Sequence, residues 1–217
     1  MNASQSKIQV WIGRLDLESA RIAGLSGLLS EQERCRARRF YFSADSRSFT
    51  AAHAMLRFIL GRALELAPAR VNFEYGPFGK PFLLDTALRF NAAHSGELAL
   101  VAVTHGREVG VDIEQVRARP EMHRIAERVF PRREFAELES APAEAKTELF
   151  FQLWTRNEAR LKASGLGLGG ARHQAEDCWS VREICPEAGY AGAVAAERGF
   201  DLELRPFHWP DSGSTAG

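Results

Sequence analysis

Two carboxylates stand two residues apart in the segment VGVDIE, at Asp112 and Glu114. On a β-strand, residues two apart project from the same face, so this pair points one way while Val111 and Ile113 point into the core. Neighbouring carboxylates repel each other unless a positive charge lies between them. Magnesium could supply that charge, since it binds oxygen ligands and commonly takes one or two carboxylates together with phosphates and water. The alternative is an exposed strand face that carries two solvated acids.

A third carboxylate, Glu158, lies in the segment WTRNEARLK, with Lys162 four residues after it. On a helix these two side chains share one face. Such a pair can serve chemistry as a base beside a cation, or it can be an ordinary surface salt bridge of little energetic weight. The choice between these interpretations depends on the other motifs of the chain.

Several segments could bind an anion. The turn GKP carries Lys80, whose ammonium can meet phosphate oxygens, and a loop of small residues holds His94 and Ser95. A histidine beside a phosphate should be held in its charged form. The segment from residue 31 to residue 47 is rich in arginine, which in a chain of zero net charge suggests a site for a defined anion. A common hairpin turn, a strand cap and a solvated helix face are the alternative explanations.

The elements that would position these residues are strands and helices in alternation. A strand is expected at IQVWIG, and a helix is expected from Glu31, with a capping box made by Ser30 and Glu33. A long helix over residues 49–66 ends before Pro68. The short strand VNFEY and the turn GPFGKPFL follow.

A second group of elements surrounds the carboxylates. Residues 88–91 form a predicted short strand that ends in the loop AAHSG. The segments ELALVAVT and VGVDIEQV form a predicted hairpin that turns at residues 105–106. One or two helices follow Pro120. An amphipathic helix over residues 147–163 ends at Gly165, and three strands come after it, CWSVREI, YAGAVAA and DLELRPF.

Strands and helices recur in a similar order in both halves of the chain, which predicts an α+β fold. We expect a pseudo-dimer of two similar α/β halves, each with a long helix packed on a small, mostly antiparallel sheet. The predicted N-terminal half is residues 1–106, and the predicted C-terminal half is residues 107–217.

Composition narrows the class of protein. The 217 residues suffice for one large domain or two smaller ones, and 45% hydrophobic with 26% charged residues is ordinary for a globular chain. The 28 basic residues balance the 28 acidic ones, which argues against nucleic-acid binding. Three cysteines without CxxC spacing, no basic-then-apolar leader and no long apolar run predict a reduced, cytoplasmic protein that does not bind membranes.

Three motifs, taken in order, carry a resemblance to a known family. The segments FNAAHS, VGVDIE and WTRNEARLKASGLGL resemble FN-x-SHS, G-(I/V)-D-(I/V)-E and W-x-x-K-E-A-x-x-K-x-x-G of the Sfp-type 4′-phosphopantetheinyl transferase superfamily. The upstream segments RRF and GKP fit the N-terminal half of that family, so the resemblance extends from about Arg36 to Leu168. The combination is specific, although no single part of it is.

The resemblance implies coenzyme A bound between two halves, with the N-terminal half contacting its phosphates and adenine and the C-terminal half carrying the metal and catalytic groups. Magnesium would bind Asp112, Glu114 and Glu158. Glu158 would be the general base, directly or through a water, and Lys162 would be the second catalytic residue. The positions that contact the coenzyme in the family correspond here to Arg36, Arg39, Lys80, His94, Ser95 and Lys162.

The implied activity is transfer of the 4′-phosphopantetheine moiety of coenzyme A to a serine of an acyl or peptidyl carrier protein, with release of 3′,5′-ADP. The enzyme would be a magnesium-dependent holo-carrier-protein synthase, a monomer that serves fatty acid, polyketide or nonribosomal peptide biosynthesis. Four arginines after VGVDIE could meet an acidic carrier: Arg117, Arg119, Arg124 and Arg128.

Two positions depart from the family's motifs. Asn157 stands where the family usually has lysine, which puts carrier contacts or the local charge balance in question. Ala93 stands where the family usually has serine, so one hydroxyl that could bind phosphate is missing. The alternatives are a coenzyme A-binding paralogue without transferase activity and a different metal-dependent phosphoryl enzyme, such as a nucleotide hydrolase.

Overall fold

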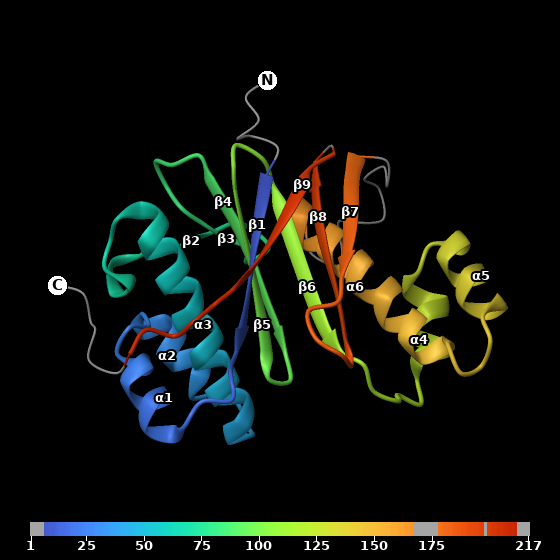
Figure 1. The fold of residues 1–217 in the computed structure, drawn as a ribbon, viewed down its shortest axis with the longest axis horizontal. Helices are drawn as coiled ribbons and strands as arrows, with labels where there is room; N and C mark the ends of the chain where they lie inside the picture. The colour runs from blue at the N-terminus through green and yellow to red at the C-terminus, as the bar shows by residue number, and fades with distance from the viewer. Residues whose placement is uncertain (1–6, 167–177, 198, 212–217) are drawn as a thin grey trace.

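Buried residues on both faces of several strands produce two sheets that share a core, and one long helix covers the outer side of each sheet (Figure 1). The computed structural model describes residues 7–166, 178–197 and 199–211. From one side of Figure 1 to the other, the layers are α3, the first sheet, the second sheet and α6. The prediction of an α+β fold is confirmed.

The first sheet has the strand order β4-β5-β1-β9. Its strands are β1 (Lys7–Arg14), β4 (Leu88–Ser95), β5 (Leu98–His105) and β9 (Asp201–Pro206). β5 pairs antiparallel with both β4 and β1, whereas β9 pairs parallel with β1, from Lys7 opposite Asp201 to Ile12 opposite Pro206. A strand from the end of the chain therefore completes a sheet that is otherwise built from the first 105 residues.

The second sheet has the order β6-β8-β7, and all of its strand pairs are antiparallel. Its strands are β6 (Val109–Gln115), β7 (Trp179–Ile184) and β8 (Tyr190–Glu197). Val111 and Ile113 of β6 lie in one hydrophobic cluster with Val10 and Leu100 of the first sheet. The inner faces of the two sheets therefore bury each other, and the acids of β6 point to the opposite side, as the sequence predicted.

Three helices and a small hairpin cover the first sheet. The helices are α1 (Ser19–Ser26), α2 (Glu31–Ala37) and α3 (Ser43–Leu64), followed by a 3-10 turn (Pro68–Arg70) and the hairpin of β2 (Glu74–Tyr75) and β3 (Pro81–Phe82). The predicted capping box of α2 is present, since Ser30 Oγ accepts from Glu33 N and Glu33 accepts from Ser30 N. α3 begins at Ser43, earlier than predicted, and it buries Met55 and Leu60 against the sheet.

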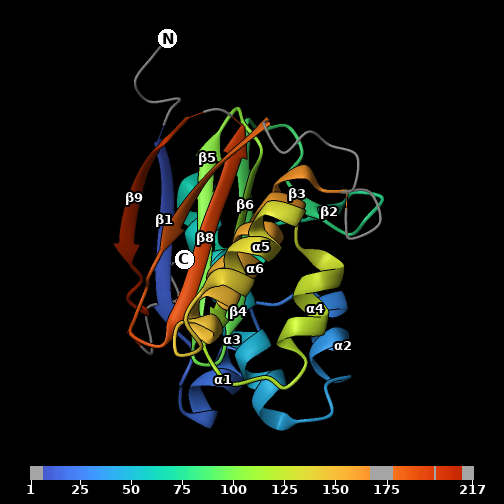
Figure 2. The same ribbon diagram turned by 90° about the vertical axis from the view of Figure 1, so that its right-hand side faces the viewer.

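The second sheet is covered by α6 (Lys146–Ser164), and α4 (Met122–Val129) and α5 (Arg132–Ser140) pack against that helix. Figure 2 shows α6 running along the outer side of β6 and β8. Gly165 ends α6 in a left-handed conformation, with φ 68°, as predicted. On the face of α6 that meets the second sheet, the small residues Ala159 and Ala163 are fully buried, whereas Trp154 and Leu161 are only partly buried.

Two predictions of local structure are wrong. The loop AAHSG is the end of β4, which reaches Ser95 and turns into β5 through Gly96 and Glu97. The predicted hairpin of ELALVAVT with VGVDIEQV does not form, because β6 pairs with β8 and the turn after β5 carries the chain from one sheet to the other. A short turn between two apolar segments gives no information about which strand the second segment pairs with.

The edges of the two sheets are joined beside the acids. Val111 N of β6 donates to the side-chain oxygen of Asn91 on β4 at 2.9 Å, and both groups are buried. Gly110 of β6 lies directly under α6, where a Cβ atom would stand 2.1 Å from Ala159 O and 2.3 Å from Ala163 N. Only glycine permits this approach, so Gly110 sets the distance between the two elements that carry the acids.

Within the ranges that the structure describes, no helix combines the length and the apolar character needed to cross a membrane.

Gly110→Ala should destabilise the protein by roughly 1–3 kcal/mol or more, because the methyl group would overlap the backbone of α6. Gly24→Ala is a matched control: no atom lies within 4 Å of its Cβ position on the helix α1, and a gain of about 0.5–1 kcal/mol is expected there. Free energies of unfolding from urea titrations measure both changes. Equal effects of the two substitutions would contradict the close approach of α6 to β6.

Candidate active site

Asp112 is the most deeply buried of the three predicted acids. Asp112 lies on β6 and is only 5% exposed to solvent. Its Oδ1 accepts a hydrogen bond from Lys162 Nζ of α6 at 2.6 Å. Its second oxygen, Oδ2, is buried and has no hydrogen-bond partner among the described residues. A buried carboxylate oxygen without a donor is costly, so this atom indicates a place where a positive group is expected to bind.

The electrostatics of the site show that the three acids lie within reach of one another. Burial raises the pKa of Asp112 to about 7 against the opposing charge of Lys162, and the negative charges of Glu114 and Glu158 add to the rise. Burial also raises the pKa of Glu158; Lys162 opposes that rise and Glu114 adds to it. Acids of β6 and α6 that are far apart in sequence therefore repel one another around a single lysine.

Glu114 is held by the end of β4. Its Oε2 accepts from Ser95 Oγ at 2.8 Å, and the same hydroxyl accepts from Gln115 N at 3.1 Å. Ser95, which the family resemblance assigns to the coenzyme, thus orients a predicted metal ligand in this structure.

The side chains of Asp112, Glu114 and Glu158 have the chemistry needed to bind a hard divalent cation. All candidate donors are carboxylate oxygens, the ligand type that magnesium prefers, and Asp112 Oδ2 has no hydrogen-bond partner within the part of the chain that the structure describes. As they stand, no three His, Cys, Asp or Glu side chains in the described part of the chain form a cluster that could hold a metal ion. Lys162 is instead the cation in contact with Asp112. The metal site therefore stays a prediction.

A group of positive side chains surrounds His94. The side chain of His94 reaches solvent, but the protein atoms around it displace much of the water from its ring. This desolvation lowers the pKa of His94 to about 4, and the charges of His53, Lys162 and Arg36 lower it further. The imidazole is therefore neutral near pH 7 when no anion is bound. A phosphate in this position would offset the neighbouring charges and favour the charged imidazole that the sequence argument expected.

Arg36 and His53 are oriented by one aromatic ring. The Arg36 guanidinium lies 5.4 Å from the centroid of Phe49, and the ring of His53 lies 4.0 Å from it. His53 Nδ1 contacts Glu33 Oε1 at 2.9 Å, and Glu33 also accepts from the buried Arg57. Sequence reasoning missed this support, although the capping box had already singled out Glu33.

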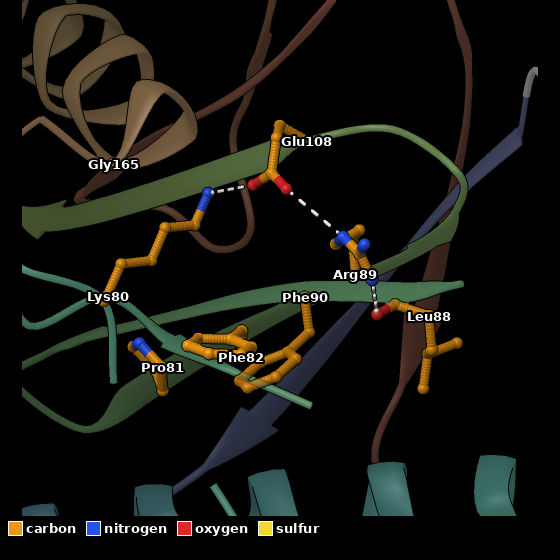
Figure 3. A pocket seen from close by; sticks show the side chains of 9 residues that line it. Lys80, Pro81, Phe82, Leu88, Arg89, Phe90, Glu108 and Gly165 are labelled. Atoms are coloured by element: carbon orange, nitrogen blue, oxygen red, sulfur yellow. Dashed lines mark hydrogen bonds and ion pairs between the residues drawn. The ribbon is translucent and has the colours of Figure 1, made fainter. Parts of the chain in front are cut away.

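Lys80 lies away from the acids. Its ammonium donates to Glu108 Oε2 at 2.6 Å (Figure 3). It also donates to Ala163 O at 2.8 Å and to Val109 O at 3.3 Å, so it joins the GKP turn to β6 and α6. It lines a pocket of about 260 Å³ that none of the three acids lines. The other residues of this pocket are Gly76, Pro81, Phe82, Leu88, Arg89, Phe90, Glu108 and Gly165.

The remaining predicted residues lie as follows. Arg39 is exposed just after α2. Ala93 is buried in the shared core, so its side chain faces away from solvent. Asn157 donates to Glu134 of α5. Gly167 and Leu168 of the third motif lie outside the described residues. Asn91 and Gly110 were missed as positioning residues, although both lie inside motifs that the sequence argument had quoted.

Comparison with known proteins identifies the family. The profile described as 4′-phosphopantetheinyl transferase superfamily matches residues 108–206, and the profile described as 4′-phosphopantetheinyl transferase, N-terminal, matches residues 18–106. The transferase HetI of Nostoc sp. is 36% identical over 220 residues, 94% of this chain and 92% of that protein. The transferase psf-1 of Bacillus pumilus is 35% identical over 157 residues, 71% and 66% of the two chains. Sfp of Bacillus subtilis is 29% identical over 141 residues, 64% and 62%.

The chain therefore belongs to the 4′-phosphopantetheinyl transferase superfamily, as its motifs suggested. Its enzyme class is that of a 4′-phosphopantetheinyl transferase, and the predicted activity, transfer of phosphopantetheine to a carrier protein, is confirmed at this level. The alternative of a coenzyme A-binding paralogue without transferase activity is not favoured.

The burial of Asp112 makes a prediction about stability in the presence of a chelator. Its pKa is about 7 in the folded state, against 3.8 for an ordinary aspartate, so the folded state binds more protons than the unfolded state between these two pH values. The free energy of unfolding should consequently fall as the pH rises from about 4 to about 7. Asp112→Asn should lack this fall, and its stability relative to the wild type should increase with pH across that window and stay constant above it.

Urea titrations at several pH values measure this difference. Asp85→Asn is the control for the carboxylate-to-amide change, since Asp85 is exposed and its left-handed backbone, with φ 55°, suits asparagine as well. A difference between Asp112→Asn and the wild type that does not vary with pH would count against a destabilising ionised Asp112.

Proposed function

We propose that this enzyme transfers the 4′-phosphopantetheine of coenzyme A to a serine hydroxyl of a carrier protein and depends on magnesium. The observation that carries the proposal is the coupling of Asp112, Glu114 and Glu158 around Lys162, at a buried carboxylate oxygen without a donor. The family relationship supports the reaction, and the acids support the ion dependence.

Glu158 is the general base of the proposed mechanism. The carrier's serine oxygen bonds to the β-phosphorus of coenzyme A while the bond from that phosphorus to the oxygen of the α-phosphate breaks. The serine proton passes to Glu158, and 3′,5′-ADP leaves with the electron pair. A carboxylate whose pKa is raised by burial is a better proton acceptor than an ordinary glutamate, which suits this role.

Lys162 stabilises the charge that develops on the diphosphate. An ammonium has three N–H donors, and Asp112 takes one of them here, so two remain for phosphate oxygens. Asp112, Glu114 and Glu158 would hold the magnesium. When bound, the ion would supply positive charge to the diphosphate oxygens and favour in-line displacement.

The phosphates of coenzyme A would be read by Arg36 and His94. The positive charges around His94, Arg36 among them, keep its ring neutral; an anion bound there would offset these charges and favour the charged ring, and His94 would lie near the 3′-phosphate. Arg39, Lys80 and Ser95 remain predicted coenzyme contacts. In addition to any contact with coenzyme A, Lys80 joins the GKP turn to α6, and Ser95 orients the side chain of Glu114.

The proposed partner is an apo acyl or peptidyl carrier protein with an acidic surface. On α4, Arg124 and Arg128 are exposed one turn apart and share a helix face, and Arg117 is exposed before that helix. We further propose that residues 1–106 and 107–217 are related halves of a pseudo-dimer that acts as a cytoplasmic monomer without nucleic acid or membrane partners. A long helix on a small sheet in each half supports the relationship.

The proposed function is tested by incubating the protein with coenzyme A, magnesium and a panel of apo-carriers, and measuring carrier mass. The wild type should add one phosphopantetheine. Glu158→Gln should lower kcat by roughly 10²- to 10⁴-fold, because an amide cannot accept the serine proton. Glu148→Gln, an exposed position in the first turn of the same helix, is the matched control and should leave kcat unchanged.

Two outcomes would contradict this assignment. A loss of less than tenfold in Glu158→Gln would move the proton transfer to another group. Release of 3′,5′-ADP without any gain in carrier mass would indicate hydrolysis instead of transfer.

The reading of the 3′-phosphate is tested by comparing coenzyme A with dephospho-coenzyme A. The wild type should prefer coenzyme A, and His94→Ala should reduce this preference by raising KM for coenzyme A alone, by about tenfold if one charged contact is lost. His105→Ala replaces an exposed histidine at the far end of the β4–β5 hairpin and serves as the control. If His94→Ala raised KM equally for the two compounds, His94 would not read that phosphate.

A further inference from the structure

Glu134, a buried carboxylate of α5, contacts residues of α6 that come both before and after Glu158 in the sequence. Glu134 is 6% exposed, and its Oε2 accepts from Asn157 Nδ2 at 2.5 Å. Its Oε1 accepts from Arg160 Nη1 at 3.1 Å and lies 3.4 Å from Arg156 Nη2. Asn157 is also fixed to its own helix, because the same Nδ2 donates to Leu153 O at 2.9 Å.

These contacts lie on one flank of α6. Successive helix residues are separated by about 100°, so the buried positions Thr155, Ala159 and Ala163 form one stripe. Arg156, Asn157 and Arg160 follow on one side of that stripe, whereas Glu158 and Lys162 lie on the other side. The Lys162–Asp112 ion pair therefore attaches one flank of α6 to β6, and Glu134 attaches the opposite flank to α5.

We propose that Glu134 is the positioning residue that sets the rotation of α6 and so directs Glu158 at the acids of β6. This inference rests on the proposed function, in which Glu158 accepts the serine proton. The small side chains under α6 would allow the helix to roll, since Ala159 and Ala163 offer no bulky group to fix its angle on the sheet. Two attachments on opposite flanks prevent such rolling, whereas one alone would not.

The same contacts explain how Asn157 is accommodated where the family usually has lysine. A buried carboxylate needs a compensating charge. Here Arg160 and Arg156 provide that charge, and the Asn157 amide adds a neutral hydrogen bond. Arg156 also lies 3.5 Å from Glu183 of β7, so part of its charge is shared. Arg160 is therefore the main counter-charge of Glu134.

Glu134→Gln tests the inference with the least change in shape. The amide loses the charge attraction for both arginines, and kcat should fall by roughly 10- to 100-fold, as a small misplacement of a reacting group can cause. KM for coenzyme A and its Kd, measured by calorimetry without carrier, should change much less than kcat, because Arg36 and His94, the proposed phosphate contacts, lie on α2 and β4 and not on α6. Glu137→Gln, an exposed glutamate of the same helix, is the matched control and should retain the kcat of the wild type.

A rescue experiment separates positioning from general loss of structure. Arg160→Gln should reduce kcat in the same way as Glu134→Gln. Adding Asn157→Lys should restore kcat to within about threefold of the wild type, because the new ammonium returns a charge to Glu134. Melting temperatures measured for every variant verify that the assays are carried out on folded protein, and Arg160→Gln keeps the test valid if Glu134→Gln does not fold.

The possible results are distinguishable. A normal kcat in folded Glu134→Gln or Arg160→Gln, beside an active wild type, would overturn the inference and leave the proposed function intact. A fall in kcat that Asn157→Lys does not restore would also overturn it. If the wild type modified no carrier, the proposed function would fail and this inference with it.

Discussion

The ion pair between Asp112 and Lys162 is the interaction on which the rest of the site depends. It joins a buried carboxylate on the edge strand of one sheet to an ammonium on the helix that covers that sheet. The contact is possible because Gly110 and two alanines bring strand and helix together. Among the described residues, the second oxygen of this carboxylate has no hydrogen-bond partner, so Lys162 satisfies only part of the buried acid. A buried carboxylate oxygen in this situation is costly to the folded protein and favours the binding of a cation.

The surrounding architecture serves to hold two different elements against each other. The shared core fixes β6 against the first sheet, and Asn91 fixes its edge. Lys80 joins the end of α6 to the start of β6, so the GKP turn acts on the geometry of the acids from a distance. The side chains proposed to bind phosphate are arranged separately, through Phe49 and the buried Glu33–Arg57 pair. The proposed phosphate contacts and the proposed metal ligands thus depend on different parts of the core.

Much of this could be predicted from the sequence, and the failures have physical reasons. Alternation along VGVDIE correctly placed Asp112 and Glu114 on one face, because strand periodicity depends only on local geometry. The same reasoning wrongly paired that strand with the one before it, since pairing depends on the distant β8. His94 and Ser95 were assigned to a loop because AAHSG contains small and polar residues, whereas tertiary pairing with β5 extends β4 through them. Glu134 carried no motif, and only the packing of α5 on α6 reveals its contacts.

The parallel pairing of β9 with β1 has a consequence for how the chain is made. Strand β1 precedes β9 by more than 180 residues, so β1 leaves the ribosome well before the segment that covers its open edge. Until β9 has been synthesised, the nascent first sheet has an unpaired edge next to apolar residues such as Trp11 and Ile12, and unpaired edges promote aggregation. Strand β9 therefore closes the edge of a sheet whose other strands lie far before it in sequence, and a truncation just before β9 would expose β1.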